Sequence, residues 1–153
     1  MAIEIRYELT GSGWAKCEMR SGDQNAVVTA SYLSDALGNL AEATVALLRG
    51  EQVVRFSFNE DRGEYRWVFE LDANTLNCKV YWVDRQWIGD PDFAANLVFS
   101  HAGPLPEFAA AVRNALAAVL AAHGPAGYKE KWIEHDFPLR AFRQISEHLG
   151  MST

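Results

Sequence analysis

The chain has 153 residues, of which 49% are hydrophobic and 22% are charged, and its formal net charge is −6 with a pI near 5.2. These values are ordinary for a soluble globular protein, and we expect a single domain over 1–153. An acidic chain without a run of basic residues offers little to the phosphates of nucleic acid, so we expect no nucleic-acid partner. No apolar run approaches the ~20 residues of a membrane span, and residues 1–5 do not resemble a signal peptide. We therefore expect no membrane association and a cytoplasmic location.

The first part of the chain alternates apolar and polar residues, which predicts strands with one buried face. Strands are expected over 3–9, 15–19 and 26–30. The links between them are rich in Gly, Ser, Asp and Asn, which favour tight turns. The segment is therefore predicted to be a three-stranded antiparallel meander.

Between residues 31 and 49 the apolar spacing changes to three and four, which is typical of a helix face. Ser31 or Ser34 is placed to accept a hydrogen bond from a free N–H of the first turn. Gly50 can adopt the left-handed conformation that ends a helix. Gly38 costs about 1 kcal/mol relative to Ala inside a helix, and we expect it to allow close approach to the sheet.

A second meander follows, with strands predicted over 53–58, 65–71 and 76–82. Its middle strand carries Tyr65, Trp67 and Phe69 at alternate positions, so these aromatic side chains share one face. Their burial contributes roughly 1.5–3 kcal/mol each before entropy is subtracted, and we expect them in the core. Residues 84–92 are predicted to form a loop, and 97–101 a seventh strand.

The C-terminal part is predicted to be helical. Pro104 begins an alanine-rich helix that Gly124 and Pro125 should end. Residues 128–134 are expected to add a helical turn or two, and a last helix is predicted over 138–149, with Asp136 as its capping residue. The order βββ-α-ββββ-α-α predicts the α+β class, with an antiparallel sheet of about seven strands and helices packed on one face.

Sequence motifs for catalysis, cofactors or metals are absent. Cys17 and Cys78 lie on the apolar faces of their strands, as buried thiols do in a reduced protein. The four histidines have no metal-ligand spacing, and the sequence contains no GxSxG, HExxH or CxxC. We expect no cofactor and no metal, and enzymatic activity has no positive support from sequence motifs.

The leading functional hypothesis is a non-enzymatic module that binds a basic protein partner. Acidic residues gather at one hairpin turn, and large apolar or aromatic residues occur in polar stretches, where they would act as anchors. The residues assigned to this surface are Glu60, Asp61, Glu64, Trp87, Trp132 and His135. A catalytic pair of His135 and Asp136 is the weaker interpretation, because adjacent residues do not normally face each other.

Two alternatives concern the other face of the second meander. In one, the protein is an enzyme or a small-molecule binder whose cleft holds an anionic ligand through Arg55, Arg66, Lys79 and Tyr81. In the other, the chain forms a homodimer through its exposed sheet face or an edge strand, since exposed apolar patches are typical of interfaces and that face carries several apolar residues. Those residues are Val53, Val68, Tyr81 and Val83.

Three segments, 31–51, 59–71 and 127–142, resemble a family of small bacterial proteins without an assigned function. The resemblance spans most of the chain but implies no activity and no site residues. Some small acidic α+β proteins of this size serve as immunity proteins in bacterial toxin systems. That analogy implies a protein-binding role of the immunity type.

Overall fold

The computed structural model describes residues 2–60, 63–84 and 95–152. Its elements follow the predicted order, and the predicted α+β class is confirmed. The elements are β1 (Ile3–Gly11), β2 (Trp14–Ser21), β3 (Gln24–Ser31), α1 (Ala36–Leu48), β4 (Val53–Glu60), β5 (Gly63–Asp72), β6 (Thr75–Asp84), β7 (Ala95–Pro104), α2 (Leu105–Trp132) and α3 (Leu139–Leu149).

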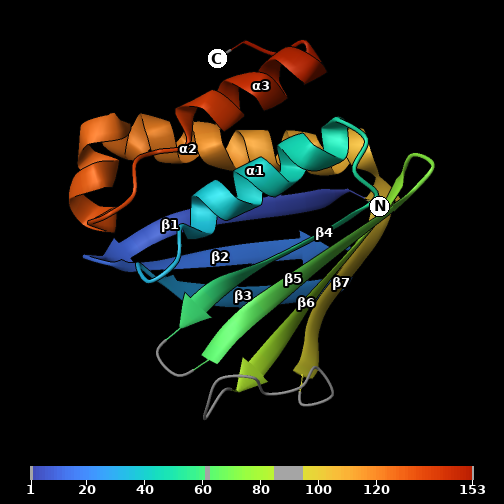
Figure 1. Cartoon of the computed structure of the whole chain (residues 1–153), viewed down its shortest axis with the longest axis horizontal. Coiled ribbons are helices and arrows are strands. Elements are labelled where there is room, and N and C mark those ends of the chain that lie inside the picture. Colours follow the sequence, from blue (N-terminus) through green and yellow to red (C-terminus); the bar gives the residue numbers. More distant parts are fainter. Residues whose placement is uncertain (1, 61–62, 85–94, 153) are drawn as a thin grey trace.

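The seven strands that the structure describes are divided between two antiparallel sheets, where the sequence predicted one. Strands β1-β2-β3 form the first sheet and β4-β5-β6-β7 form the second, each in chain order (Figure 1). Within the first sheet, and from β4 to β6 in the second, successive strands are separated by only two residues, which explains their local order. Helix α1 separates β3 from β4, so the chain leaves the first sheet before the second begins.

The register of the second sheet places the predicted aromatic residues in the core. Phe56 is opposite Trp67, and Phe69 is opposite Cys78. Trp67 and Phe69 are fully buried, and Tyr65 is partly buried. Because strand side chains alternate between faces, this register directs the intervening residues of β4, β5 and β6 to the opposite face, which is called the outer face below.

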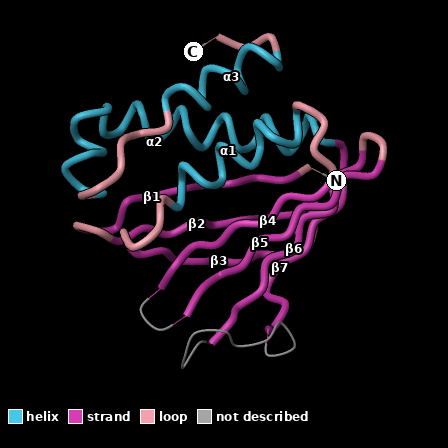
Figure 2. Tube along the Cα trace, in the orientation of Figure 1, coloured by secondary structure: helices cyan, strands magenta, loops and turns pink. Residues whose placement is uncertain are grey.

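All three helices lie on the same side of the two sheets (Figures 1 and 2). Helix α2 packs along β1, and α1 packs against β4, so the helices cover the inner faces of both sheets. The buried side chains of both sheets and of the helices form one continuous hydrophobic cluster. Phe108 of α2 joins the helical layer to the second sheet through an edge contact with Phe69, at a centroid distance of 5.2 Å.

Helix α2 is longer than predicted. The backbone of Gly124 is non-helical (φ 67°, ψ 169°), as expected from the Gly–Pro pair, but helical geometry resumes and continues to Trp132. Among the helices that the structure describes, α2 alone is long and apolar enough to cross a membrane, with a mean hydropathy of 1.3 over its most apolar 18-residue window. A core helix of a soluble protein meets the same criterion, and 44% of that window is buried inside the protein.

The predicted helix ends are partly confirmed. Gly50 and Gly150 both have positive φ after α1 and α3. The predicted serine caps are wrong, because no side chain caps α1 and the two serines bond to β4 instead. Ser31 Oγ donates to the Asn59 carbonyl at 3.0 Å, and Ser34 Oγ accepts from the Asn59 N–H at 3.0 Å.

Asp136 does not cap α3. No side-chain cap is found on that helix, and the exposed Asp136 carboxylate pairs with Lys129 at 3.3 Å. The reason is that Pro138 takes the N-cap position, two residues beyond Asp136.

Candidate functional site

A hollow of about 230 Å³ lies on the outer face of the second sheet. The described residues that line it come from four adjacent strands and are Arg55, Arg66, Val68, Glu70, Tyr81 and Ala95. Three of the four residues predicted to hold a ligand on this face are among them.

Strand register explains why these side chains meet. Arg55 is directly opposite Val68, and Arg66 is directly opposite Tyr81. Opposed side chains in an antiparallel pair have Cβ atoms about 4.5–5.5 Å apart. Val68 lies between Arg55 and Lys79, which are opposite it on the two neighbouring strands. It is only 9% exposed, so it forms an apolar floor for the hollow.

A buried carboxylate orients one of the two guanidinium groups. Glu64, also on the outer face, is 5% exposed, and its Oε2 accepts a hydrogen bond from the Ser57 hydroxyl. Arg66 Nη2 lies 3.5 Å from Glu64 Oε1, and both side chains are largely shielded from solvent. A charge-assisted pair in a shielded place is stronger than one on an open surface, so Arg66 is held in a defined position.

Lys79, the fourth predicted ligand residue, does not line this hollow. It is opposite Val68 in the register, and its side chain is exposed. It lines a separate cavity of about 330 Å³ next to the β2–β3 turn. Lys79 is therefore a natural control for the hollow.

The residues assigned to a protein-binding surface have different environments. Asp61 and Trp87 lie outside the described residues. Glu60 is half-buried at the end of β4, and the carboxylate of Glu64 is buried as described above. Trp132 is fully buried in the core, so its side chain is not exposed as an anchor.

His135 lies near the start of α1, and among the described residues no ion pair is found between His135 and Asp136, whose carboxylate pairs with Lys129. Its Nε2 is 3.2 Å from the carbonyl oxygen of Tyr32. The nearby carboxyl is that of Asp35. Burial raises the pKa of Asp35, while His135 and the backbone amide of Gly38 lower it, and Asp136 raises it.

Asp35 belongs to a polar cluster inside the protein that the sequence did not predict. Burial raises the pKa values of Tyr7 and Tyr128, and interaction with Asp35 raises both further. Within the described residues, the two hydroxyls and Asp35 Oδ1 are buried without a hydrogen-bond partner. None of these three residues is among the described residues that line the cavities of this section.

The residues proposed for a homodimer are unequally exposed. Val53 is 57% exposed, Tyr81 is partly buried, and Val68 and Val83 are buried. Leu97 and Val98 of β7 add exposed apolar surface that the sequence analysis did not single out. Homodimer formation stays a prediction.

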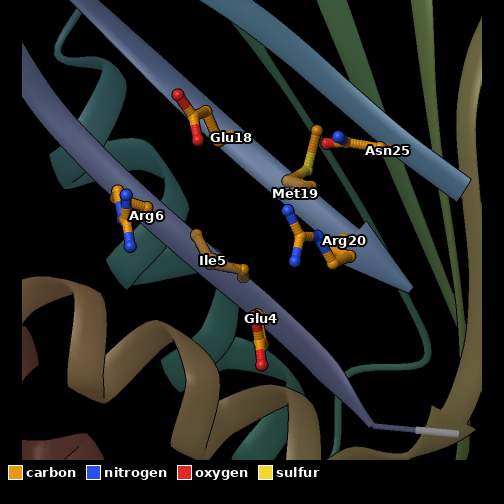
Figure 3. Close-up of a pocket in the computed structure, with 7 residues that line it drawn as sticks. All are labelled: Glu4, Ile5, Arg6, Glu18, Met19, Arg20 and Asn25. Carbon is orange, nitrogen blue, oxygen red and sulfur yellow. The ribbon is translucent and has the colours of Figure 1, made fainter. Parts of the chain in front are cut away.

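A shallow groove of about 180 Å³ on the first sheet has the character of a solvated surface (Figure 3). Glu4 is opposite Arg20, and Arg6 is opposite Glu18, so acidic and basic side chains alternate across β1 and β2. Such cross-strand pairs stabilise a sheet by about 0.2–1 kcal/mol each. The pairing of opposite charges between the two strands therefore accounts for the polar character of this groove.

No protein-family model matches the sequence. No curated protein and no solved structure matches it either.

Proposed function

We propose that the protein binds a small organic anion in the hollow on the outer face of the second sheet. The observation that carries this proposal is that Arg55, Arg66 and Tyr81 line one hollow with an apolar floor. Ligand sites commonly combine apolar walls with a few convergent polar groups.

The chemistry of the wall favours a carboxylate attached to a small apolar body. A guanidinium group presents planar donors that match the two oxygens of a carboxylate. Val68 and Ala95 offer apolar contact beside these donors. The volume of about 230 Å³ would hold roughly seven or eight waters at ~30 Å³ each, which suits a metabolite-sized ligand.

The test is a titration of the ¹⁵N-labelled protein with benzoate, citrate and inorganic phosphate at constant ionic strength. We expect benzoate to shift backbone amide resonances of β4, β5 and β6 around Arg55, Val68 and Tyr81. Arg55→Ala should weaken benzoate binding about tenfold or more, because a charge-assisted hydrogen bond contributes about 1.5–3 kcal/mol. Arg55 is preferred over Arg66 because Arg66 also neutralises the buried Glu64.

Lys79→Ala is the matched control. It removes one positive charge from a neighbouring strand position that does not line the hollow, and we expect affinity to stay within about twofold. Equal weakening by both variants would indicate only a general electrostatic effect and would refute the site. Shifts that map to another surface, or no shift with any of the three anions, would also refute it.

A protein-binding role, including one of the immunity type, stays a prediction. Of its assigned residues, Glu64 and Trp132 are buried in the structure, and Asp61 and Trp87 lie outside the described part. The hollow is the better-supported site because several of its predicted residues share one cavity wall.

A further inference from the structure

A second cavity, of about 330 Å³, lies where the β2–β3 turn meets β6 and β7. Ser21 and His101 both line it, although they are 80 residues apart in the sequence. Ser21 Oγ is 2.6 Å from His101 Nδ1, and the two residues are 5% and 4% exposed. The cavity therefore contains a serine in direct contact with a base.

Three residues in the cavity wall could act as a nucleophile, namely Ser21, Cys78 and Ser100, and the structure favours Ser21. Burial, followed by interaction with Cys17, raises the pKa of the Cys78 thiol well above its usual value, so that thiol stays protonated and weakly reactive. The Ser100 hydroxyl accepts a hydrogen bond of 3.4 Å from the side-chain amide Nε2 of Gln24, and it has no histidine contact among the described residues. A serine requires an adjacent base to become a nucleophile, and Ser21 has one.

The ring of His101 is held in place and is suited to accept a proton at neutral pH. It lies nearly parallel to Phe108 of α2, with centroids 6.5 Å apart. Burial and the N-terminus lower its pKa, and Glu107 raises it, with a net lowering. Its Nε2 is buried without a hydrogen-bond partner among the described residues. The other ring nitrogen, Nδ1, contacts the Ser21 hydroxyl and is therefore the nitrogen that can accept its proton.

We propose that Ser21 and His101 form a nucleophile–base pair that hydrolyses small esters in this cavity. This activity is independent of ligand binding in the hollow, which has different wall residues. The amide side chain of Gln24, which is opposite Ser21 in the register of β2 and β3, also lines the cavity and would be the N–H donor for a developing oxyanion.

The reaction would proceed in two balanced steps. In the first, Ser21 Oγ bonds to the ester carbonyl carbon and passes its proton to His101 Nδ1, and the alcohol leaves with that proton as the carbon–oxygen bond breaks. In the second, water loses a proton to Nδ1 and attacks the acyl–serine. Cleavage of the acyl–serine bond then releases the acid and returns the proton to Ser21.

The first experiment uses the intact wild-type protein and an alkyl fluorophosphonate, which modifies activated serines covalently. We expect one adduct by intact-mass spectrometry, and peptide mapping should place it on Ser21. p-Nitrophenyl acetate should show a burst of nitrophenolate close to one equivalent of enzyme. An unmodified protein, or an adduct at another residue, would overturn the proposal without any variant having to fold.

Variants then assign the two roles. Ser21→Ala should abolish the adduct, whereas Ser12→Ala, which removes an exposed serine between β1 and β2 that does not line the cavity, should leave its rate unchanged within about twofold. His101→Gln should slow modification of Ser21 about 100-fold or more, since a positioned base contributes about that much. A wild-type rate in His101→Gln, at equal folded content by circular dichroism, would show that Ser21 reacts without the imidazole and would refute the pair.

Discussion

At the scale of single residues, the packing of Asp35 over the first turn of α1 explains the glycine inside that helix. A Cβ placed on Gly38 would lie 2.2 Å from Asp35 Oδ2, which is too close for any real contact. The sequence analysis expected Gly38 to make room for the sheet. The group that occupies the space is a carboxylate from the residue before the helix.

This packing predicts that Gly38→Ala and Asp35→Ala are energetically coupled. In the Asp35→Ala background, Gly38→Ala should stabilise the protein by up to about 1 kcal/mol through helix propensity. In the wild type the new methyl group must displace the carboxylate, so the gain should disappear, with a coupling energy of about 1 kcal/mol or more. Urea unfolding of the four proteins measures this cycle, and an equal effect of Gly38→Ala in both backgrounds would contradict the packing.

The residues that could be predicted are those whose position depends on alternation along a strand. Tyr65, Trp67 and Phe69 were assigned to one face, and Arg55 and Arg66 to the other, because period-2 alternation and short hairpins fix the faces locally. The contact between Ser21 and His101 depends on how one sheet packs against the other. No local pattern contains that information.

At the scale of elements, the link between α2 and α3 contains a strained turn. Ile133 has φ 68° and ψ −70°, and the Glu134 N–H donates to the Trp132 carbonyl at 2.7 Å, which defines a γ-turn of the rare, strained kind. A β-branched residue at positive φ is unusual and costs about 1–3 kcal/mol. A hydrogen bond of 2.7 Å from the Gly13 N–H to the Lys131 carbonyl fixes the approach to this turn.

We predict that Ile133→Gly is more stable than Ile133→Ala. Both variants lose the isoleucine side chain, which is 44% exposed, but only glycine adopts this conformation without steric cost. The difference should be about 1 kcal/mol or more in favour of glycine, the reverse of their order inside a helix. Thermal unfolding of the two variants measures it. As a control, Ala121 lies exposed in the regular part of α2, where Ala121→Gly should be destabilising.

At the scale of the whole molecule, His101 lies where both sheets and the helical layer meet. Its ring contacts Ser21 of the first sheet and Phe108 of α2, while its backbone pairs with Cys78 in the second sheet. A charge on this ring would therefore lie in the junction that joins the three parts. From outside its own strand, the N-terminus lowers the pKa of His101 and Glu107 raises it.

We predict that the free energy of unfolding decreases as the pH falls below about 6.5, the ordinary pKa of histidine. The pKa of His101 is lowered in the native state, chiefly by burial, so in this range the unfolded chain binds more protons and stability is lost with acidification. The loss from this group should level off once the pH is below its native pKa.

Urea unfolding from about pH 8 to 5 measures the dependence, and His101→Gln, which does not titrate, should flatten it. The difference between the two curves reports the imidazole, and parallel curves would contradict its burial as a neutral base. A neutral ring near pH 7 is also the form that can accept the proton of Ser21, so Ser21 should lose reactivity at the lower end of this pH range, where His101 becomes protonated in the native state and the stability loss levels off.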